Sequence, residues 1–157
     1  MYLPLMSKEQ LAEYSSAVNN FIDTLNTFSA SDLSKSPSAS DWSAAFVVHH
    51  MADSESYFLT RYFNALVENR PNIHPFDEDL FPVSLKYAER DPQKSLALIK
   101  ASSAILVDVL QSVPQEGWNR ISIHPEAGEM KVSDILAKAI SHTSAHTGQL
   151  KEIKAAL

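Results

Sequence analysis

Four separate segments of this sequence carry apolar residues spaced three and four positions apart, and this spacing constrains the fold more than any other feature. In the first segment the stripe consists of Leu11, Tyr14, Val18, Phe21, Leu25 and Phe28. Such spacing places the side chains on one face of an α-helix, and that face has to be buried against other helices. The sequence therefore predicts an all-α fold, a four-helix bundle.

Capping residues indicate where each helix begins. Ser7 and Gln10 form the S-x-x-Q pattern of a capping box. Ser43 is a suitable N-cap for the second helix, and Asp91 followed by Pro92 suits the start of the third. The four helices are expected to start at Ser7, just after Ser43, at Pro92 and near Ser133, and the second is expected to run to about Glu68.

Two long connections interrupt the helical pattern, at residues 69–84 and 114–131. Both are longer than a tight bundle turn requires, and loops of this kind often cover a functional site. Each contains one histidine, His74 and His124, for which exposure or loop hydrogen bonding is expected. The only strand-like stretch is a short one at 121–123.

Composition excludes several classes of function. The chain has no cysteine, which removes disulfides, thiolate ligands and a cysteine nucleophile. A net charge of −6 with scattered basic residues argues against nucleic-acid binding and against a polybasic membrane patch. No signal-peptide pattern and no apolar run near the roughly 20 residues of a membrane span are evident. We expect a single cytoplasmic domain over residues 1–157, with no membrane or nucleic-acid partner.

His142 and His146 are the strongest functional signal, because four residues are about one helical turn and place both imidazoles on one face. That face also carries the apolar stripe Val132, Ile135, Leu136, Ala139, Leu150 and Ile153. The pair can bind one metal ion, or it can be a pair of core histidines hydrogen-bonded to neighbouring hydroxyls or carbonyls.

A third histidine, His50, lies on the inward stripe of the second helix, whereas His49 is rotated about 100° away from it. Three imidazole nitrogens suit a divalent transition metal, with Zn or Ni first and Fe or Mn as further options. Three protein ligands also leave a coordination position open for water or substrate, as in reactive sites.

Two acidic residues are candidates for the surroundings of such a site. Asp53 follows His50 by three residues, so it either orients that ligand through a hydrogen bond or is a solvated helix charge. Glu126 lies in the second loop and could shape the pocket.

The segments DWSAAFVVHHMADSE, RYFNALVENRPNIHPFDED, IHPEAGE and SHTSAHTGQL together resemble the DinB/YfiT-like family of metalloenzymes, from Trp42 to Leu150. The HPE loop resembles the YfiT-like branch, which includes bacillithiol S-transferases and proteins called metal-dependent hydrolases. The resemblance implies a four-helix bundle, usually dimeric, with a divalent metal on His50, His142 and His146.

The sequence also departs from that branch. Glu55 stands where relatives tend to carry histidine, Ser141 where they often have tryptophan, and Leu80–Phe81 replace a further tryptophan. These differences leave the three histidines intact, but they change the surroundings in which a substrate would be selected.

Three functions are left open. The first is a metal-dependent S-transferase that adds a low-molecular-weight thiol, bacillithiol- or mycothiol-like, to an electrophilic small molecule. The second is a small-molecule hydrolase that uses metal-bound water, with Asp53, Glu55 and Glu126 as candidate general bases. The third is a non-catalytic metal-binding or stress-associated bundle protein. The sequence argues against a zinc peptidase, because Thr143 occupies the position of the catalytic glutamate in the H-E-x-x-H motif.

Overall fold

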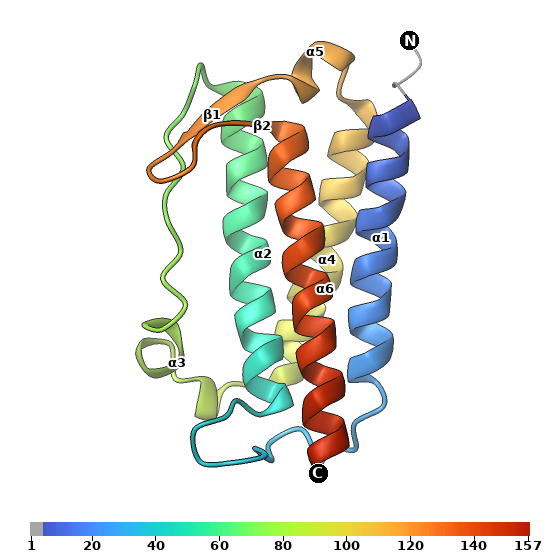
Figure 1. Ribbon diagram of the computed structural model, residues 1–157, viewed down its shortest axis with the longest axis vertical. Helices are drawn as coiled ribbons and strands as arrows, with labels where there is room; N and C mark the ends of the chain where they lie inside the picture. The colour runs from blue at the N-terminus through green and yellow to red at the C-terminus, as the bar shows by residue number, and fades with distance from the viewer. Residues whose placement is uncertain (1–4) are drawn as a thin grey trace.

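Four long helices stand side by side in the computed structural model, which describes residues 5–157 and the side chains from Ser7 onward (Figure 1). They are α1 (Leu5–Leu25), α2 (Ala44–Val67), α4 (Pro92–Ser112) and α6 (Val132–Ala156). Helices α1 and α6 are parallel neighbours, as are α2 and α4, and the two pairs run in opposite directions. The predicted four-helix bundle is confirmed.

The predicted apolar stripes form the core. All six stripe residues of α1 and its continuation, from Leu11 to Phe28, are buried. The six apolar stripe residues of α6, from Val132 to Ile153, are buried as well. Full burial of a large apolar side chain stabilises a fold by about 1.5–3 kcal/mol, so the facing stripes account for the bundle.

Side-chain caps begin α2 and α4 as predicted. The Ser43 hydroxyl accepts a hydrogen bond from the Phe46 N–H at 3.3 Å. The Asp91 carboxylate accepts one from the Gln93 N–H at 2.9 Å, and Pro92 follows at the first helical position. Each cap satisfies an N–H that has no partner within the helix.

The predicted start of the first helix is wrong. Helix α1 already includes Leu5, so Ser7 lies inside it rather than at its cap. The Gln10 side chain does not turn back to Ser7, because its Nε2 donates to the Ser133 carbonyl at 2.8 Å and ties α1 to α6. Helix α6 begins one residue before the expected Ser133.

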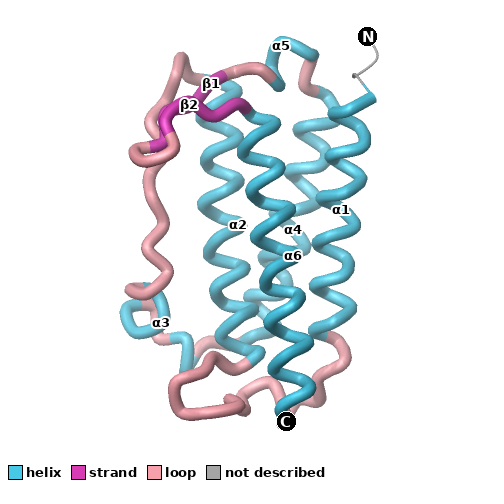
Figure 2. The backbone as a smooth tube through the Cα atoms, viewed as in Figure 1, coloured by secondary structure: helices cyan, strands magenta, loops and turns pink. Residues whose placement is uncertain are grey.

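The α2–α4 connection runs along the outside of α2 and contains a short helix, α3 (Phe81–Ser84), and a 3₁₀ turn, η1 (Tyr87–Glu89). The α4–α6 connection contains α5 (Gln115–Trp118) and an antiparallel hairpin (Figure 2). Strand β1 (Ile121–His124) pairs with β2 (Gly128–Lys131). The short strand signal is confirmed, but its polar partner β2 was not expected.

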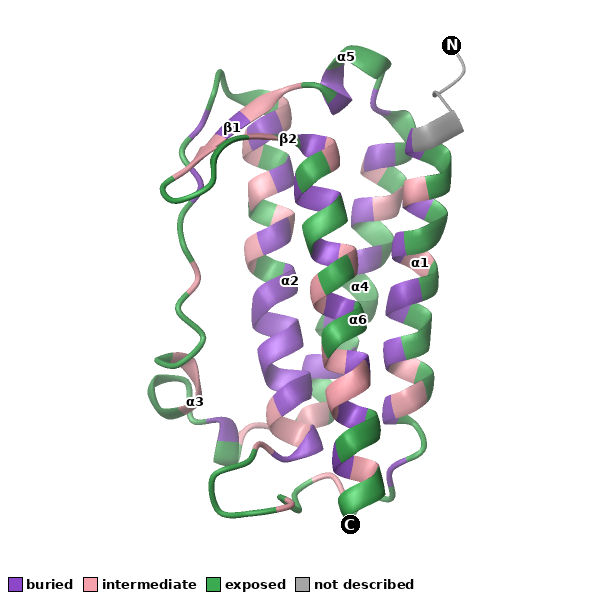
Figure 3. Cartoon of the chain, viewed as in Figure 1, coloured by how far each residue is buried: buried purple, intermediate pink, exposed green. Residues whose placement is uncertain are grey.

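The two connections join into one layer over α2. The Ile73 N–H donates to the Ile123 carbonyl and the Ile123 N–H to the Pro71 carbonyl, both at 2.8 Å. Arg120 fastens this layer to the end of α2, since its guanidinium donates to the Ala65 and Glu68 carbonyls. The layer is exposed on its outer side, and the middle of α2 is buried (Figure 3).

Helix α4 alone among the described helices is long and apolar enough, by length and composition, to cross a membrane. The sequence expectation that no segment approaches this length was therefore too strict. Within the bundle, Leu96, Ile99, Leu106 and Leu110 of α4 pack into the core.

Candidate metal centre

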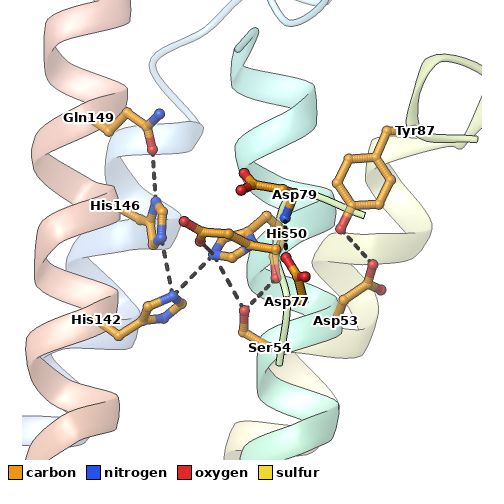
Figure 4. A network of polar contacts seen from close by, with 10 residues as sticks. His50, Asp53, Ser54, Asp77, Asp79, Tyr87, His142, His146 and Gln149 are labelled. Atoms are coloured by element: carbon orange, nitrogen blue, oxygen red, sulfur yellow. Dashed lines mark hydrogen bonds and ion pairs between the residues drawn. The ribbon is translucent and has the colours of Figure 1, made fainter. Parts of the chain in front are cut away.

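His50, His142 and His146 converge between α2 and α6, as Figure 4 shows. The Nε2 atoms of His50 and His142 are 3.0 Å apart, and those of His142 and His146 are 3.1 Å apart. One ligand nitrogen from each histidine lies within 4.8 Å of the other two. Tertiary structure thus brings the separately predicted His50 to the helical pair.

This donor set fits a transition metal ion. Two nitrogens bound at about 2.0–2.1 Å in a tetrahedral site lie about 3.3 Å apart, close to the spacing seen here. Burial, followed by the neighbouring His146 and His142, lowers the pKa of His50 to about 3. Burial, followed by His146 and then Arg61, lowers the pKa of His142 to about 4. The imidazoles are therefore neutral near pH 7 and offer lone pairs, as metal ligation requires.

Gln149 orients one member of the cluster. Its Oε1 lies 2.7 Å from Nδ1 of His146 and accepts the proton there, which leaves Nε2 of His146 as a lone-pair donor facing His142. Gln149 was not predicted from the sequence, although its i+3 spacing from His146 was a usable signal.

Aromatic rings and one carboxylate surround His50. The rings of Trp42 and Phe76 lie 5.3 and 5.5 Å from it, centroid to centroid, and shield it from water. Oε2 of Glu78 lies 3.6 Å from Nε2 of His50, and the Glu78 side chain is 55% exposed. Glu78 was also missed, because three acids in the run 77–79 give no sign of which one turns inward.

A cavity of about 320 Å³ opens beside His142. Its walls come from α2, from α6 and from the layer of connections over α2. Glu126, in the turn between β1 and β2, lines this cavity as the sequence suggested, and so do Glu78 and His124. The arrangement gives a small molecule access to the histidine cluster.

Asp53 is placed differently from either sequence interpretation. Its two carboxylate oxygens accept from the Arg90 guanidinium at 2.7 and 2.9 Å, and Oδ2 accepts from the Tyr87 hydroxyl at 2.6 Å. It is buried rather than solvated, and it points away from the histidines in Figure 4. Asp53 links α2 to the start of α4 and does not orient His50.

Of the three histidines outside the cluster, His124 lines the cavity and the other two lie elsewhere. Nδ1 of His49 lies 2.8 Å from the Ser95 hydroxyl of α4, which agrees with its predicted rotation away from the inner stripe. His74 is exposed in the α2–α4 connection, and its carbonyl accepts from Arg61 at 3.1 Å.

Glu55, one of the candidate bases, lies in the bundle core instead of on the cavity wall. It is 3% exposed, and its Oε2 accepts from the Tyr14 hydroxyl at 2.8 Å. Burial raises the pKa of Glu55 to about 7, although the bond from Tyr14 opposes this shift. The carboxyl is thus only partly ionised at neutral pH.

This raised pKa predicts how Glu55→Gln changes stability with pH. Because the folded pKa lies above the unfolded one, the contribution of Glu55 to stability falls as pH rises from about 4.5 through about 7. We expect Glu55→Gln to match wild type near pH 5 and to exceed it by about 3 kcal/mol near pH 8. Urea denaturation at both pH values measures this, and an advantage that does not change with pH would contradict it.

A family comparison agrees with this site. The sequence model of the DinB superfamily matches residues 13–150. The chain belongs to the DinB superfamily. The matched region contains all three histidines of the cluster and the layer that covers α2.

Several sequence relatives carry names that mark them as candidate metal-dependent hydrolases. One from Bacillus cereus is 29% identical over 118 residues, which cover 72% of this chain and 65% of the relative. YfiT of Bacillus subtilis is 27% identical over 113 residues, which cover 71% of this chain and 64% of YfiT. The chain thus spans less than two thirds of the length of both relatives.

Solved structures share the fold. One is YfiT of Bacillus subtilis, described as a candidate metal-dependent hydrolase with an unusual four-helix bundle topology. It superposes on this chain with a TM-score of 0.86 at 20% sequence identity. The superposition covers 99% of this chain and 89% of the YfiT chain. A mycothiol-dependent maleylpyruvate isomerase superposes with a TM-score of 0.77 at 14% identity, over 94% of this chain and 61% of its own. At these identities the similarity establishes the fold.

Proposed function

We propose that this protein is a metal-dependent S-transferase that joins a low-molecular-weight thiol to an electrophilic small molecule. The observation that carries this proposal is the convergence of three neutral imidazoles beside a cavity of about 320 Å³. The fold shared with a mycothiol-dependent enzyme supports a thiol as one substrate. Bacillithiol-like and mycothiol-like thiols are the proposed class.

His50, His142 and His146 would hold the metal, for which we propose Zn or Ni. Such an ion, when bound, supplies Lewis acidity that lowers the pKa of a coordinated thiol or water. The protein supplies the surroundings: Trp42 and Phe76 exclude water from His50. A low-dielectric wall strengthens electrostatic interactions inside the site.

Glu78 is placed to accept a proton. Its carboxylate is the acidic group nearest to the cluster among the described residues, 3.6 Å from Nε2 of His50. Because the side chain is more than half exposed, it can pass that proton to solvent. A general base placed in this way typically contributes 10²- to 10⁴-fold to a rate, as a rough range.

Glu78 also favours a second candidate function. A small-molecule hydrolase needs a general base beside the metal, and none of the three bases suggested by sequence is as well placed as Glu78. The names of the relatives support this alternative. The two candidates differ in whether turnover requires a thiol.

The test is conjugation of a fluorogenic electrophile by the zinc- or nickel-loaded protein with bacillithiol, mycothiol, cysteine or coenzyme A. We expect turnover that depends on the thiol and on the metal. Hydrolysis of ester or amide substrates without thiol would instead select the hydrolase. If neither activity appears with metal bound, the non-catalytic interpretation stands.

Glu78→Gln should lower kcat by about 10²- to 10⁴-fold while metal content stays unchanged, because it removes a base but no ligand. Asp79→Asn is the matched control. It removes the same charge from the same loop, and no contact of the Asp79 carboxylate with the histidines is found among the described residues. Equal losses in both variants would show that only the loop's net charge matters.

A further inference from the structure

Two cations that have no carboxylate partner among residues 7–157 face the cavity beside the histidines. Arg61 of α2 and Lys138 of α6 both line it. Among the described residues, neither forms a salt bridge. Lys138 precedes His142 by four residues, and Arg61 follows His50 by eleven, so each lies on the same helix face as a histidine of the cluster.

The Arg61 guanidinium is held in place but not neutralised. Its Nη2 donates to the His74 carbonyl at 3.1 Å, and its central carbon lies 5.2 Å from the centre of the Phe58 ring. Its Nε is buried and has no hydrogen-bond partner in the part of the chain that the structure describes. Partial burial of a cation without a counter-ion is unfavourable, and a bound anion would remove that penalty.

The acidic residues of the cavity are separated from these cations. Glu78 lies against His50, and Glu126 lies in the exposed turn of the hairpin. Neither comes within salt-bridge distance of Arg61 or Lys138. The cavity therefore has an acidic group beside the histidine cluster and a separate, unpaired cationic wall.

We propose that Arg61, assisted by Lys138, binds a carboxylate of the substrate in this cavity, so that the substrates are small molecules that carry a carboxylate away from the reacting group. A guanidinium suits this role because its planar donors match a carboxylate. The reacting end of the substrate then points to the histidines and Glu78. The claim that the bound molecule is a substrate rests on the proposed function. The claim that Arg61 binds a carboxylate does not.

Arg61 also lines a second cavity of about 280 Å³, on the side of Ile73 and Ser122. Tyr57 borders both cavities. The Ser122 hydroxyl is buried and has no hydrogen-bond partner within the described part of the chain. Arg61 thus lies at the boundary between the two cavities. A substrate whose carboxylate binds Arg61 can place the rest of the molecule in either cavity.

The test compares phenylacetate with its uncharged analogue phenylacetamide, by calorimetry or ligand-observed NMR, on the full chain with and without zinc. We expect phenylacetate to bind at least about 10-fold more tightly in both forms, the effect of a charge-assisted hydrogen bond. Arg61→Met should abolish this preference, Arg61→Lys should retain part of it, and Lys138→Met should weaken it. Arg70→Met is the control, because Arg70 pairs with Glu129 on the exposed hairpin.

Three results would overturn the inference. They are a preference that survives in Arg61→Met, a preference seen only with zinc bound, and no binding of either probe at up to about 10 mM. Arg61→Lys retains the positive charge and guards against a folding defect in Arg61→Met. Since binding needs no turnover, an Arg61-dependent preference without thiol conjugation would refute the proposed function alone. Conjugation without the preference would refute this inference alone.

Discussion

His142→Ala is expected to reduce bound metal from about one ion per chain to almost none and to abolish metal-dependent turnover. His142 is central to the cluster, since its Nε2 lies within 3.1 Å of Nε2 in both other histidines. Loss of a residue that merely orients a ligand already costs 10- to 100-fold in metal affinity, so loss of a ligand should cost more than about 100-fold. Elemental analysis and chelator competition measure both quantities.

A graded series makes this result specific. Gln149→Leu removes only the hydrogen-bond partner of His146 and should weaken metal binding by about 10- to 100-fold. His74→Ala removes an exposed histidine outside the cluster and should leave affinity unchanged. Full metal content in His142→Ala, or its loss in His74→Ala, would show that the three histidines are not the ligands.

Asp53→Ala should destabilise the protein by about 3 kcal/mol, because it leaves the Arg90 guanidinium and the Tyr87 hydroxyl without their acceptor. The Arg90 side chain is 26% exposed, which places the effect at the lower end of the range for buried ion pairs. Urea denaturation provides the free energy of unfolding. Metal affinity of the folded variant should equal that of wild type.

Glu129→Ala is the comparison for this ion pair. It breaks the exposed pair with Arg70, which should cost less than about 1 kcal/mol. Metal affinity is measured without urea, at a temperature where Asp53→Ala is folded. A lower affinity than wild type would support the sequence interpretation that Asp53 orients His50.

The helices and most of their boundaries could be predicted because the signals are local. The stripe from Leu11 to Phe28 and the caps Ser43 and Asp91 each depend on residues within a few positions. The capping box at Ser7 was mispredicted, because Gln10 donates to the Ser133 carbonyl of α6 rather than back to its own helix end. Strand β2 was missed because its polar sequence pairs only when β1 lies beside it.

Acidic residues show the same division within the site. The sequence offered Asp53, Glu55 and Glu126 equally as candidate general bases. In the structure Asp53 forms an ion pair, Glu55 lies in the core and Glu126 lines the cavity. Glu78, which contacts the cluster, was indistinguishable from its acidic neighbours. Which carboxylate serves the site depends on how the α2–α4 connection folds over α2.

By itself, the sequence determined that this chain forms a helical bundle with three inward-facing histidines. Helical periodicity decides which face of a helix a residue occupies, and burial of apolar faces decides that those faces meet. Only the tertiary structure decided that His50 reaches His142, that Glu78 lies beside them, and that Arg61 forms no salt bridge with any other described residue. These are contacts between segments far apart in the sequence, and they depend on helix order and on the path of two loops, which no local pattern encodes.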